Sequence, residues 1–343
     1  MPTANPIAGT LVFLLGGIAA ATYLLPFRGV KGWAYETGWL VSVLAGWLVF
    51  PLVFDAIVIP DFWNVLGAAP TATLFRSFGF GILWGVGALC WALMVRYLGI
   101  GLGLGIGAGL CAATGTLLPP ICTGHAADLV ATSSALLVLS GVGIALLGIV
   151  LVGVAGRFKE GEMSDADKKK AVAEFNFKKG LVTAIIAGVA SAGINFGLQG
   201  APELEKAALA AGASPTWAGM PVLTVVLWGG LVTQLVWSFA QHRKNRSFGN
   251  YILNPRPMNY LLSISVGVVG VMQFVLQKAG EPLMGDFRYV SFAVLMSSAV
   301  FFSALLGVSL GEWKGTSVRT KTLLGAGISV LAVGFCTMAA GGK

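Results

Sequence analysis

About ten uninterrupted apolar stretches, each near twenty residues long, fill almost the whole chain. Examples are residues 6–25, 39–60, 134–155, 181–200 and 323–340. A helix needs about 20 apolar residues to cross a bilayer core of roughly 30 Å. Because a water-soluble domain has no place for so many runs of that length, the sequence predicts an all-α polytopic membrane protein embedded in the lipid bilayer.

The composition agrees with a membrane protein. Hydrophobic residues make up 56% of the chain and charged residues only 10%, whereas a soluble domain carries about 25% charged residues. The longest polar segment, residues 156–180, leaves almost no room for a domain outside the membrane. We assign ten spans, at residues 6–25, 36–59, 77–95, 99–119, 133–155, 181–200, 217–239, 258–278, 289–310 and 322–340.

The positive charge is distributed unevenly between the two sets of loops. Of the 22 basic residues, 17 lie in loops that follow odd-numbered spans. Lys and Arg accumulate on the cytoplasmic side of membrane proteins. We therefore expect these loops in the cytoplasm and both termini on the other side, which is the periplasm if the membrane is a bacterial inner membrane. The net charge of +8 then reports orientation and predicts no nucleic-acid partner.

A charged segment divides the chain into two halves. We predict a first five-helix repeat at residues 1–156, a cytoplasmic linker at 157–180 and a second five-helix repeat at 181–343. An odd number of spans in each half makes the second half enter the membrane from the opposite side, so the repeat is inverted, as in many secondary transporters. A faint trace remains in the similarity of residues 17–21 (Gly-Ile-Ala-Ala-Ala) to residues 188–192 (Gly-Val-Ala-Ser-Ala).

Polar and aromatic side chains recur at helical spacing inside three of the predicted spans. Residues three, four or seven apart share one face of a helix, and an unpaired amide in hydrocarbon costs several kcal/mol, so these stripes face other helices or water. They either hold the bundle together by hydrogen bonds or line a polar cavity. With Tyr23, the candidate substrate-binding residues are Trp84, Trp91, Ser191, Asn195, Gln199, Gln273 and Gln277.

The depth of these side chains in the membrane favours a polar cavity over hydrogen bonding that only holds the bundle together. Counted from the span ends, Trp84, Asn195 and Gln273 lie at similar levels on three different helices. Carboxamides donate and accept hydrogen bonds at once, and an aromatic face covers the C–H face of a sugar ring. No Arg or Lys lies at central depth to meet an anion. The pattern predicts a small neutral sugar as the substrate.

Few ionisable side chains are placed to carry a proton through the membrane. Glu36 at the start of the second span and Asp55 near its other end are the candidates for proton coupling, since a partly desolvated carboxyl group can exchange a proton near neutral pH. The alternative for Glu36 is a structural role at a helix start, balanced by the helix dipole and Lys31. No sequence pattern indicates a metal site or a cofactor. The four cysteines lack metal-ligand spacing.

Several short segments are distinctive: residues 26–33 (Pro-Phe-Arg-Gly-Val-Lys-Gly-Trp) followed by Glu36-Thr37, and residues 84–87, 94–99, 174–181, 191–193, 273–274 and 311–313. These segments resemble the L-rhamnose/proton symporter family of the drug/metabolite transporter superfamily. The resemblance runs from about residue 10 to the C-terminus. It implies ten helices in two inverted repeats, alternating access, and uptake of a 6-deoxyhexose with protons across the bacterial inner membrane. Departures from the family pattern at Ala88, Cys90, Arg288 and Leu295 bear on the substrate and on coupling.

Three other functions compete with sugar uptake. A membrane enzyme would need a catalytic constellation, yet the only histidines, His125 and His242, lie on opposite sides by this topology. A channel would need a continuous polar pore, whereas the polar stripes converge at one depth. An exporter or facilitator of another small metabolite with the same fold is the remaining alternative.

Overall fold

All regular secondary structure in the described part of the protein is helical. The computed structural model describes all residues except 1–3, 123, 125, 163–176, 254–255 and 342–343, so most of the predicted linker lies outside the described residues. The longer helices are α1 (Pro6–Thr22), α2 (Tyr35–Leu44), α3 (Phe50–Val58), α5 (Thr71–Cys122), α6 (Ser133–Glu162), α8 (Phe177–Ser191), α11 (Met220–Asn245), α13 (Pro257–Gly280), α14 (Ser291–Ser309) and α15 (Val318–Gly341).

Shorter helices connect or extend these elements. A π-helical turn, η2 (Ala45–Val49), joins α2 to α3 and makes one span of them. The 3-10 segment η5 (Glu281–Val290) joins α13 to α14, and α9 (Gly193–Gln199) continues α8 after a one-residue break. The others are η1 (Leu25–Gly29), α4 (Phe62–Ala68), η3 (Ala126–Val130), α10 (Pro202–Ala210), η4 (Ser247–Gly249) and α12 (Asn250–Leu253).

Within the described residues, eight segments are long and apolar enough to cross a membrane. One of them, Pro257–Ser309, contains both α13 and α14, and a further apolar helix, Ile106–Cys122, is shorter than the others. This confirms the predicted class of polytopic helical membrane protein.

Helix α5 doubles back on itself. A Cβ atom placed on Gly107 would lie 2.8 Å from the sulfur of Met94 and 3.2 Å from Cη2 of Trp91. In a straight helix, thirteen residues rise about 20 Å. The chain therefore reverses between Met94 and Gly107, and this reversal divides α5 into two arms.

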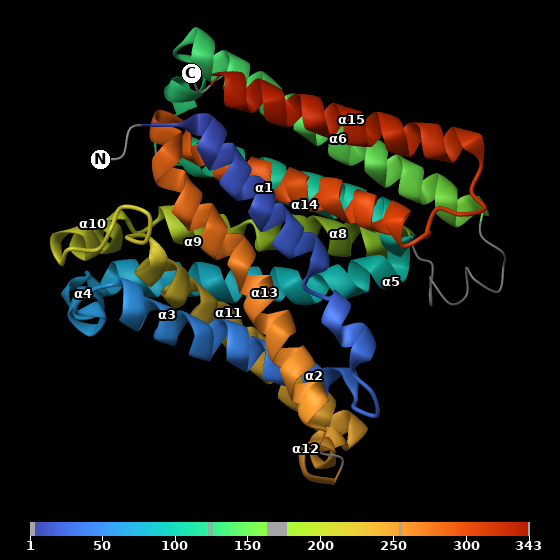
Figure 1. Ribbon diagram of the computed structural model, residues 1–343, viewed down its shortest axis with the longest axis horizontal. Coiled ribbons are helices and arrows are strands. Elements are labelled where there is room, and N and C mark those ends of the chain that lie inside the picture. The colour runs from blue at the N-terminus through green and yellow to red at the C-terminus, as the bar shows by residue number, and fades with distance from the viewer. Residues whose placement is uncertain (1–3, 123, 125, 163–176, 254–255, 342–343) are drawn as a thin grey trace.

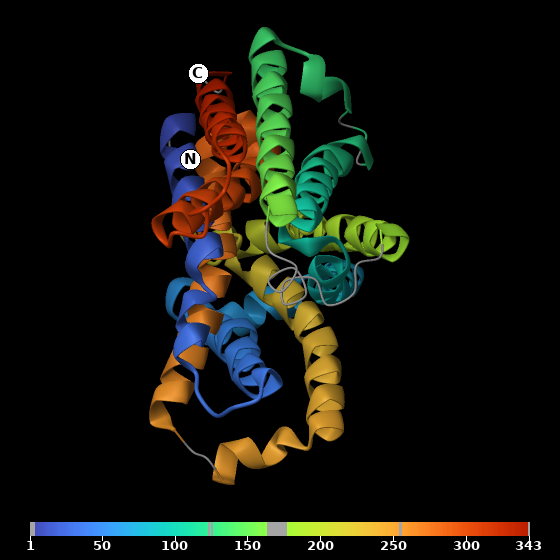
Figure 2. The same ribbon diagram turned by 90° about the vertical axis from the view of Figure 1, so that its right-hand side faces the viewer.

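Several helix pairs pack closely against each other. Helix α6 lies along α15, α8 packs against α5, and α1 packs against both α13 and α14 (Figure 1). Both termini lie at the same end of the bundle, near the start of α1, as Figures 1 and 2 show from two directions.

Glycines bring several helix pairs into backbone contact. A Cβ on Gly46 would lie 2.3 Å from the carbonyl oxygen of Gly267, and one on Gly81 would lie 2.1 Å from that of Val226. Close approach through small residues is the usual way in which membrane helices associate, because lipid provides no hydrophobic drive between them. These contacts fix α13 against η2 and α11 against the first arm of α5.

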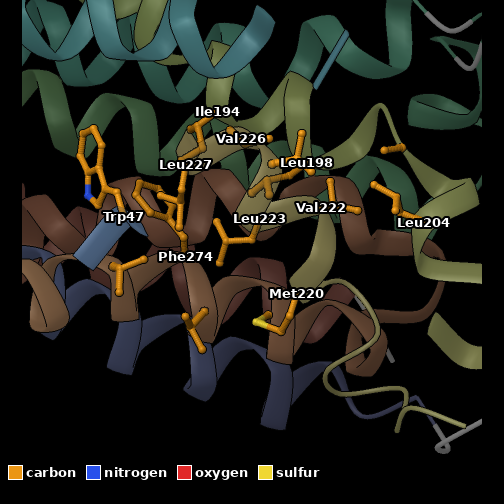
Figure 3. Packing of buried hydrophobic residues seen from close by; sticks show 14 of the residues in the cluster. Trp47, Ile194, Leu198, Leu204, Met220, Val222, Leu223, Val226, Leu227 and Phe274 are labelled. Carbon is orange, nitrogen blue, oxygen red and sulfur yellow. The ribbon is translucent and has the colours of Figure 1, made fainter. Parts of the chain in front are cut away.

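The largest apolar core lies where α9, α11 and α13 meet. Figure 3 shows Ile194 and Leu198 of α9 close to Val226 and Leu227 of α11, with Phe274 of α13 nearby. All of these side chains are buried. This packed region closes one end of the cavity described next.

Candidate substrate cavity

A cavity of about 610 Å³ lies between the two halves of the chain. Its wall is built by α1, α2, η2, α5, α6, α8, α9, α13 and α14. At one end the wall includes Lys159, Glu312 and Trp313, and the Glu312 side chain is 46% exposed, so the cavity reaches the surface there. We call this the Glu312 end. The opposite end is closed by Ile194, Phe292 and the helix segments behind them.

Aromatic rings dominate the deep part of the wall. The rings of Trp47 and Trp84 lie with their centroids 4.4 Å apart and their planes at 36°, and Phe274 meets Trp84 edge to face at 5.5 Å. Trp47 belongs to the π-helical turn η2, a local irregularity that is frequent at functional sites. Together these rings provide an apolar surface on which a C–H face of a small ring can lie.

A few polar groups interrupt this apolar wall. The indole Nε1 of Trp91 donates to the Ser191 hydroxyl at 2.8 Å, and the Gln273 amide donates to the carbonyl oxygen of Gly270 at 2.7 Å. The Tyr23 ring also lines the cavity and lies beside Gly270. A largely apolar pocket with a small number of placed hydrogen-bonding groups is typical of small-molecule sites.

The cavity wall includes five of the eight residues that the sequence named for substrate binding: Tyr23, Trp84, Trp91, Ser191 and Gln273. The other three lie elsewhere. The amide groups of Asn195 and Gln277 are fully buried behind the wall, where Gln277 Nε2 donates to Asn195 Oδ1 at 2.9 Å. Gln199 lies at the end of α9 and is absent from the wall.

The two predicted coupling carboxyl groups are also buried away from the wall. Glu36 is 4% exposed and accepts hydrogen bonds from Ser247 Oγ at 2.6 Å and Asn245 Nδ2 at 3.0 Å. Asp55 is 1% exposed and accepts from Thr224 Oγ1 at 2.6 Å. Each carboxyl group thus ties its own helix to α11 or to the turn that follows α11.

Sequence reasoning missed several wall residues. Trp39, Ser42 and Trp47 face the cavity from one span. Trp39 and Ser42 are three residues apart and share a helix face, whereas Trp47 lies in the π-helical turn, so its spacing from them does not identify it. Lys159 and Glu160 were assigned to a loop, but α6 continues to Glu162 and carries them along the cavity. Lys159 lies 4.0 Å from Glu312 and over the ring of Trp313, so its charge is matched at the surface end.

In the described part of the chain, no group of three or more His, Cys, Asp or Glu side chains lies close enough together to hold a metal ion. The wall offers aromatic rings for stacking, and a hydroxyl, an indole and a carboxamide for hydrogen bonding.

A cavity between membrane-spanning helices that reaches the surface at the Glu312 end is typical of membrane carriers for small solutes. Comparison with known proteins gives the family. The profile of the L-rhamnose-proton symport protein family (RhaT) matches residues 3–341, and the chain belongs to this family of transporters, which are not enzymes.

Relatives of this chain share about a third of their residues with it. A protein named L-rhamnose-proton symporter from Cronobacter sakazakii is 35% identical over 331 residues, which cover 95% of this chain and 94% of that protein. A protein of the same name from Salmonella paratyphi A is 34% identical over 331 residues and covers 95% of each chain. The similarity therefore spans both halves of the molecule and the whole cavity.

Proposed function

We propose that this protein takes up L-rhamnose, or a closely related neutral 6-deoxyhexose, together with a proton by alternating access across the bacterial inner membrane. The observation that carries the proposal is the cavity lined by Trp47, Trp84 and Gln273, in a chain that matches a symport family over nearly its full length. Uptake rather than export or facilitation is favoured by the names of the relatives.

The cavity suits a small deoxysugar. Its volume of about 610 Å³ falls within the range of roughly 300–1,000 Å³ typical of small-molecule pockets. The rings of Trp84 and Phe274 match the C–H face and the methyl group of a 6-deoxyhexose, while Ser191 and Gln273 can meet its hydroxyl groups. Binding by few polar groups on an apolar wall favours a neutral ligand.

We also propose ten spans in two inverted repeats. The neighbours of α1 and α8 support it, because they correspond when the two halves are exchanged. In the first half α1 packs on α13 and α14 of the second, and in the second half α8 packs on both arms of α5. The glycines of the faint sequence repeat behave alike: a Cβ on Gly17 would lie 2.8 Å from backbone of Ser298, and one on Gly188 would lie 2.9 Å from backbone of Gly107.

Uptake driven by a pH gradient tests the proposed function. Purified protein in liposomes should accumulate labelled L-rhamnose when the outside is more acidic than the inside, and sugar addition should raise the outside pH. Related sugars added as competitors define the specificity. Equilibration of L-rhamnose without accumulation would indicate a facilitator, and no L-rhamnose flux at all would overturn the proposal.

The orientation in the membrane makes a separate prediction. From the 17-to-5 division of basic residues, a phosphatase that is active only in the periplasm should be active when fused after Lys343 and inactive when inserted after Gly315, in the turn between α14 and α15. Gly315 is exposed and has open space around it, so an insertion is tolerated there. The reverse pattern of activity would place the Glu312 end of the cavity in the periplasm.

Loss of one carboxamide should weaken binding without unfolding the protein. Gln273→Ala should lower L-rhamnose affinity by about 1–3 kcal/mol, the scale of a lost buried hydrogen bond, as measured by titration calorimetry on the purified protein. Ser265→Ala is the matched control on the same helix, because its hydroxyl donates to Leu261 of its own helix. Equal affinities in both variants would remove Gln273 from the binding site.

A further inference from the structure

A buried polar cluster lies directly behind the closed end of the cavity. We call it the Glu281 cluster, and its side chains are at most 4% exposed. Asn195 follows the wall residue Ile194 in the chain, and Ser291 precedes the wall residue Phe292. The cluster and the cavity wall are therefore adjacent along the chain at two points, one in α9 and one in α14. The members of the cluster are Asn195, Gln277, Lys278, Glu281 and Ser291.

The carboxylate of Glu281 is the centre of this cluster. Lys278 Nζ lies 2.5 Å from its Oε2 atom, while Ser291 Oγ at 3.2 Å and Gln277 Nε2 at 3.3 Å donate to its Oε1 atom. Gln277 Nε2 also donates to Asn195 Oδ1, and Asn195 Nδ2 donates to the carbonyl oxygen of Gly115 at 2.5 Å. Four helical elements, α5, α9, α13 and α14, are thus joined to η5 through this one carboxylate.

The charges around the cluster are balanced. Lys278 Nζ lies 3.9 Å from Glu205 Oε2 on α10, and Arg288 on η5 donates to Glu205 Oε1 at 2.6 Å. Two cations and two carboxylates therefore share this end of the bundle. Neutralising one carboxylate would leave an excess positive charge on a lysine that is 4% exposed, which is costly unless the ammonium group reaches water. The neutral form of Glu281 therefore favours opening of this end.

The cluster also contains a hydrogen-bond acceptor that lacks a donor. Among the described residues, Gln277 Oε1 is buried without a hydrogen-bond partner. An acceptor left unpaired in a buried site costs about 1–3 kcal/mol. A neutral carboxylic acid at Glu281 would supply a new O–H donor beside this amide, whereas the ionised form can only accept. The neighbours of Glu281 are thus arranged to accommodate its protonated form once Lys278 has moved.

We propose that the carboxyl group of Glu281 is the binding site of the transported proton, and that the proton and the Lys278 ammonium group compete for it. The inference rests on the proposed function and names the group at which coupling occurs. Glu36 and Asp55, the carboxyl groups indicated by the sequence, are held by hydroxyl and amide donors outside this cluster.

This competition links binding of the proton to whether the Glu281 end is open to water. When the Glu281 end is open to water, a proton binds the carboxylate and forms an O–H bond, and Lys278 is solvated. After this end closes, Lys278 returns to the carboxylate, the O–H bond breaks, and the proton leaves through the cavity toward the Glu312 end. One proton enters and one leaves in each cycle. Because the two arrangements hold the proton with different affinity, the proton gradient drives the cycle in one direction.

The test uses full-length protein in liposomes and a double variant that removes both charges, Glu281→Gln with Lys278→Met. Two fluxes of labelled L-rhamnose are measured: counterflow without a pH gradient, and accumulation with an imposed gradient. At one proton per sugar, a gradient of about one pH unit supports about tenfold accumulation. We expect the accumulation ratio of the double variant to fall to one, while counterflow stays measurable because exchange needs no net proton movement.

Three comparisons decide the outcome. Glu203→Gln, an exposed carboxyl group on α10, is the matched control and should accumulate sugar as the unaltered protein does. Accumulation that survives in the double variant, or that is lost in Glu36→Gln or Asp55→Asn but survives in Glu281→Gln, overturns the assignment of Glu281. If the double variant does not fold, Glu281→Asp alone decides, since a shortened carboxylate should still accumulate sugar but with an altered dependence on pH. Failure of the unaltered protein to accumulate L-rhamnose would instead reject the proposed function.

Discussion

Gly81→Leu should prevent most of the protein from folding. A Cβ on this glycine would lie 2.1 Å from the carbonyl oxygen of Val226 and 3.0 Å from Cα of Gly229, so the obstacle is backbone that no rotamer change can move. Overpacking usually costs about 1–3 kcal/mol and sometimes more, and separation of two helices along their contact falls at the upper end. The fraction recovered as a single species in mild detergent should drop severalfold.

Gly79→Leu is the control for this prediction. It lies two residues away on the same arm of α5 and is exposed, and a Cβ atom placed there would meet no neighbouring helix within 4 Å. A leucine there adds apolar surface facing lipid and should leave recovery and thermal midpoint close to those of the unaltered protein. Equal recovery of the two leucine variants would show that α5 and α11 do not meet at Gly81.

The class of polytopic helical membrane protein was predictable from the sequence, because bilayer thickness sets the length of the apolar runs. The hairpin in α5 follows from this limit: Thr71–Cys122 is too long for one crossing, and the basic residue Arg96 divides its two apolar runs. The short helices α4 and α10 were not predicted. They lie outside the apolar runs, and α10 is fixed by burial of Leu204 and Ala208, a tertiary contact that local pattern does not report.

Helical periodicity does not decide whether a buried polar side chain faces the cavity or pairs with another helix. Spacing indicates that Ser191 and Asn195 point inward on nearly the same face, yet Ser191 lines the cavity and Asn195 pairs with Gln277 behind it. Both arrangements satisfy the need for a buried partner, so the cost of an unpaired amide cannot distinguish them. Depth counted along a helix is defined to about one turn, or about 5 Å, so it does not separate the wall residue Ile194 from Asn195 next to it in the chain.

The contribution of aromatic residues to the cavity wall was underestimated for a related reason. Trp39 and Trp47 occur in an apolar run where an indole is as suitable for packing as for binding, and only the fold shows that they face the cavity. The π-helical turn at Ala45–Val49 has no sequence signature of its own. It brings Trp47 onto Trp84, and this pair of rings is the feature of the site with the largest expected effect on substitution.

Trp84→Ala should abolish measurable transport of L-rhamnose at micromolar concentrations. Trp84 is 8% exposed and contacts Trp47, Phe274 and the backbone of Gly230, so its removal costs both a stacking surface for the sugar and packing between α5, α11 and α13. Large-to-small changes of this kind destabilise by about 3–5 kcal/mol in well-packed sites. We expect a lowered thermal midpoint together with a loss of affinity that added L-rhamnose does not rescue.

Trp84→Phe separates the two effects. A phenyl ring keeps an aromatic face toward the cavity and most of the contact with Phe274, so the thermal midpoint should recover most of the way, while affinity should remain severalfold below that of the unaltered protein because the stacking area is smaller. The thermal shift produced by saturating L-rhamnose measures binding in each variant, since a ligand stabilises the folded state by mass action. A full shift in Trp84→Ala would mean that the indole supports the fold and takes no part in holding the sugar.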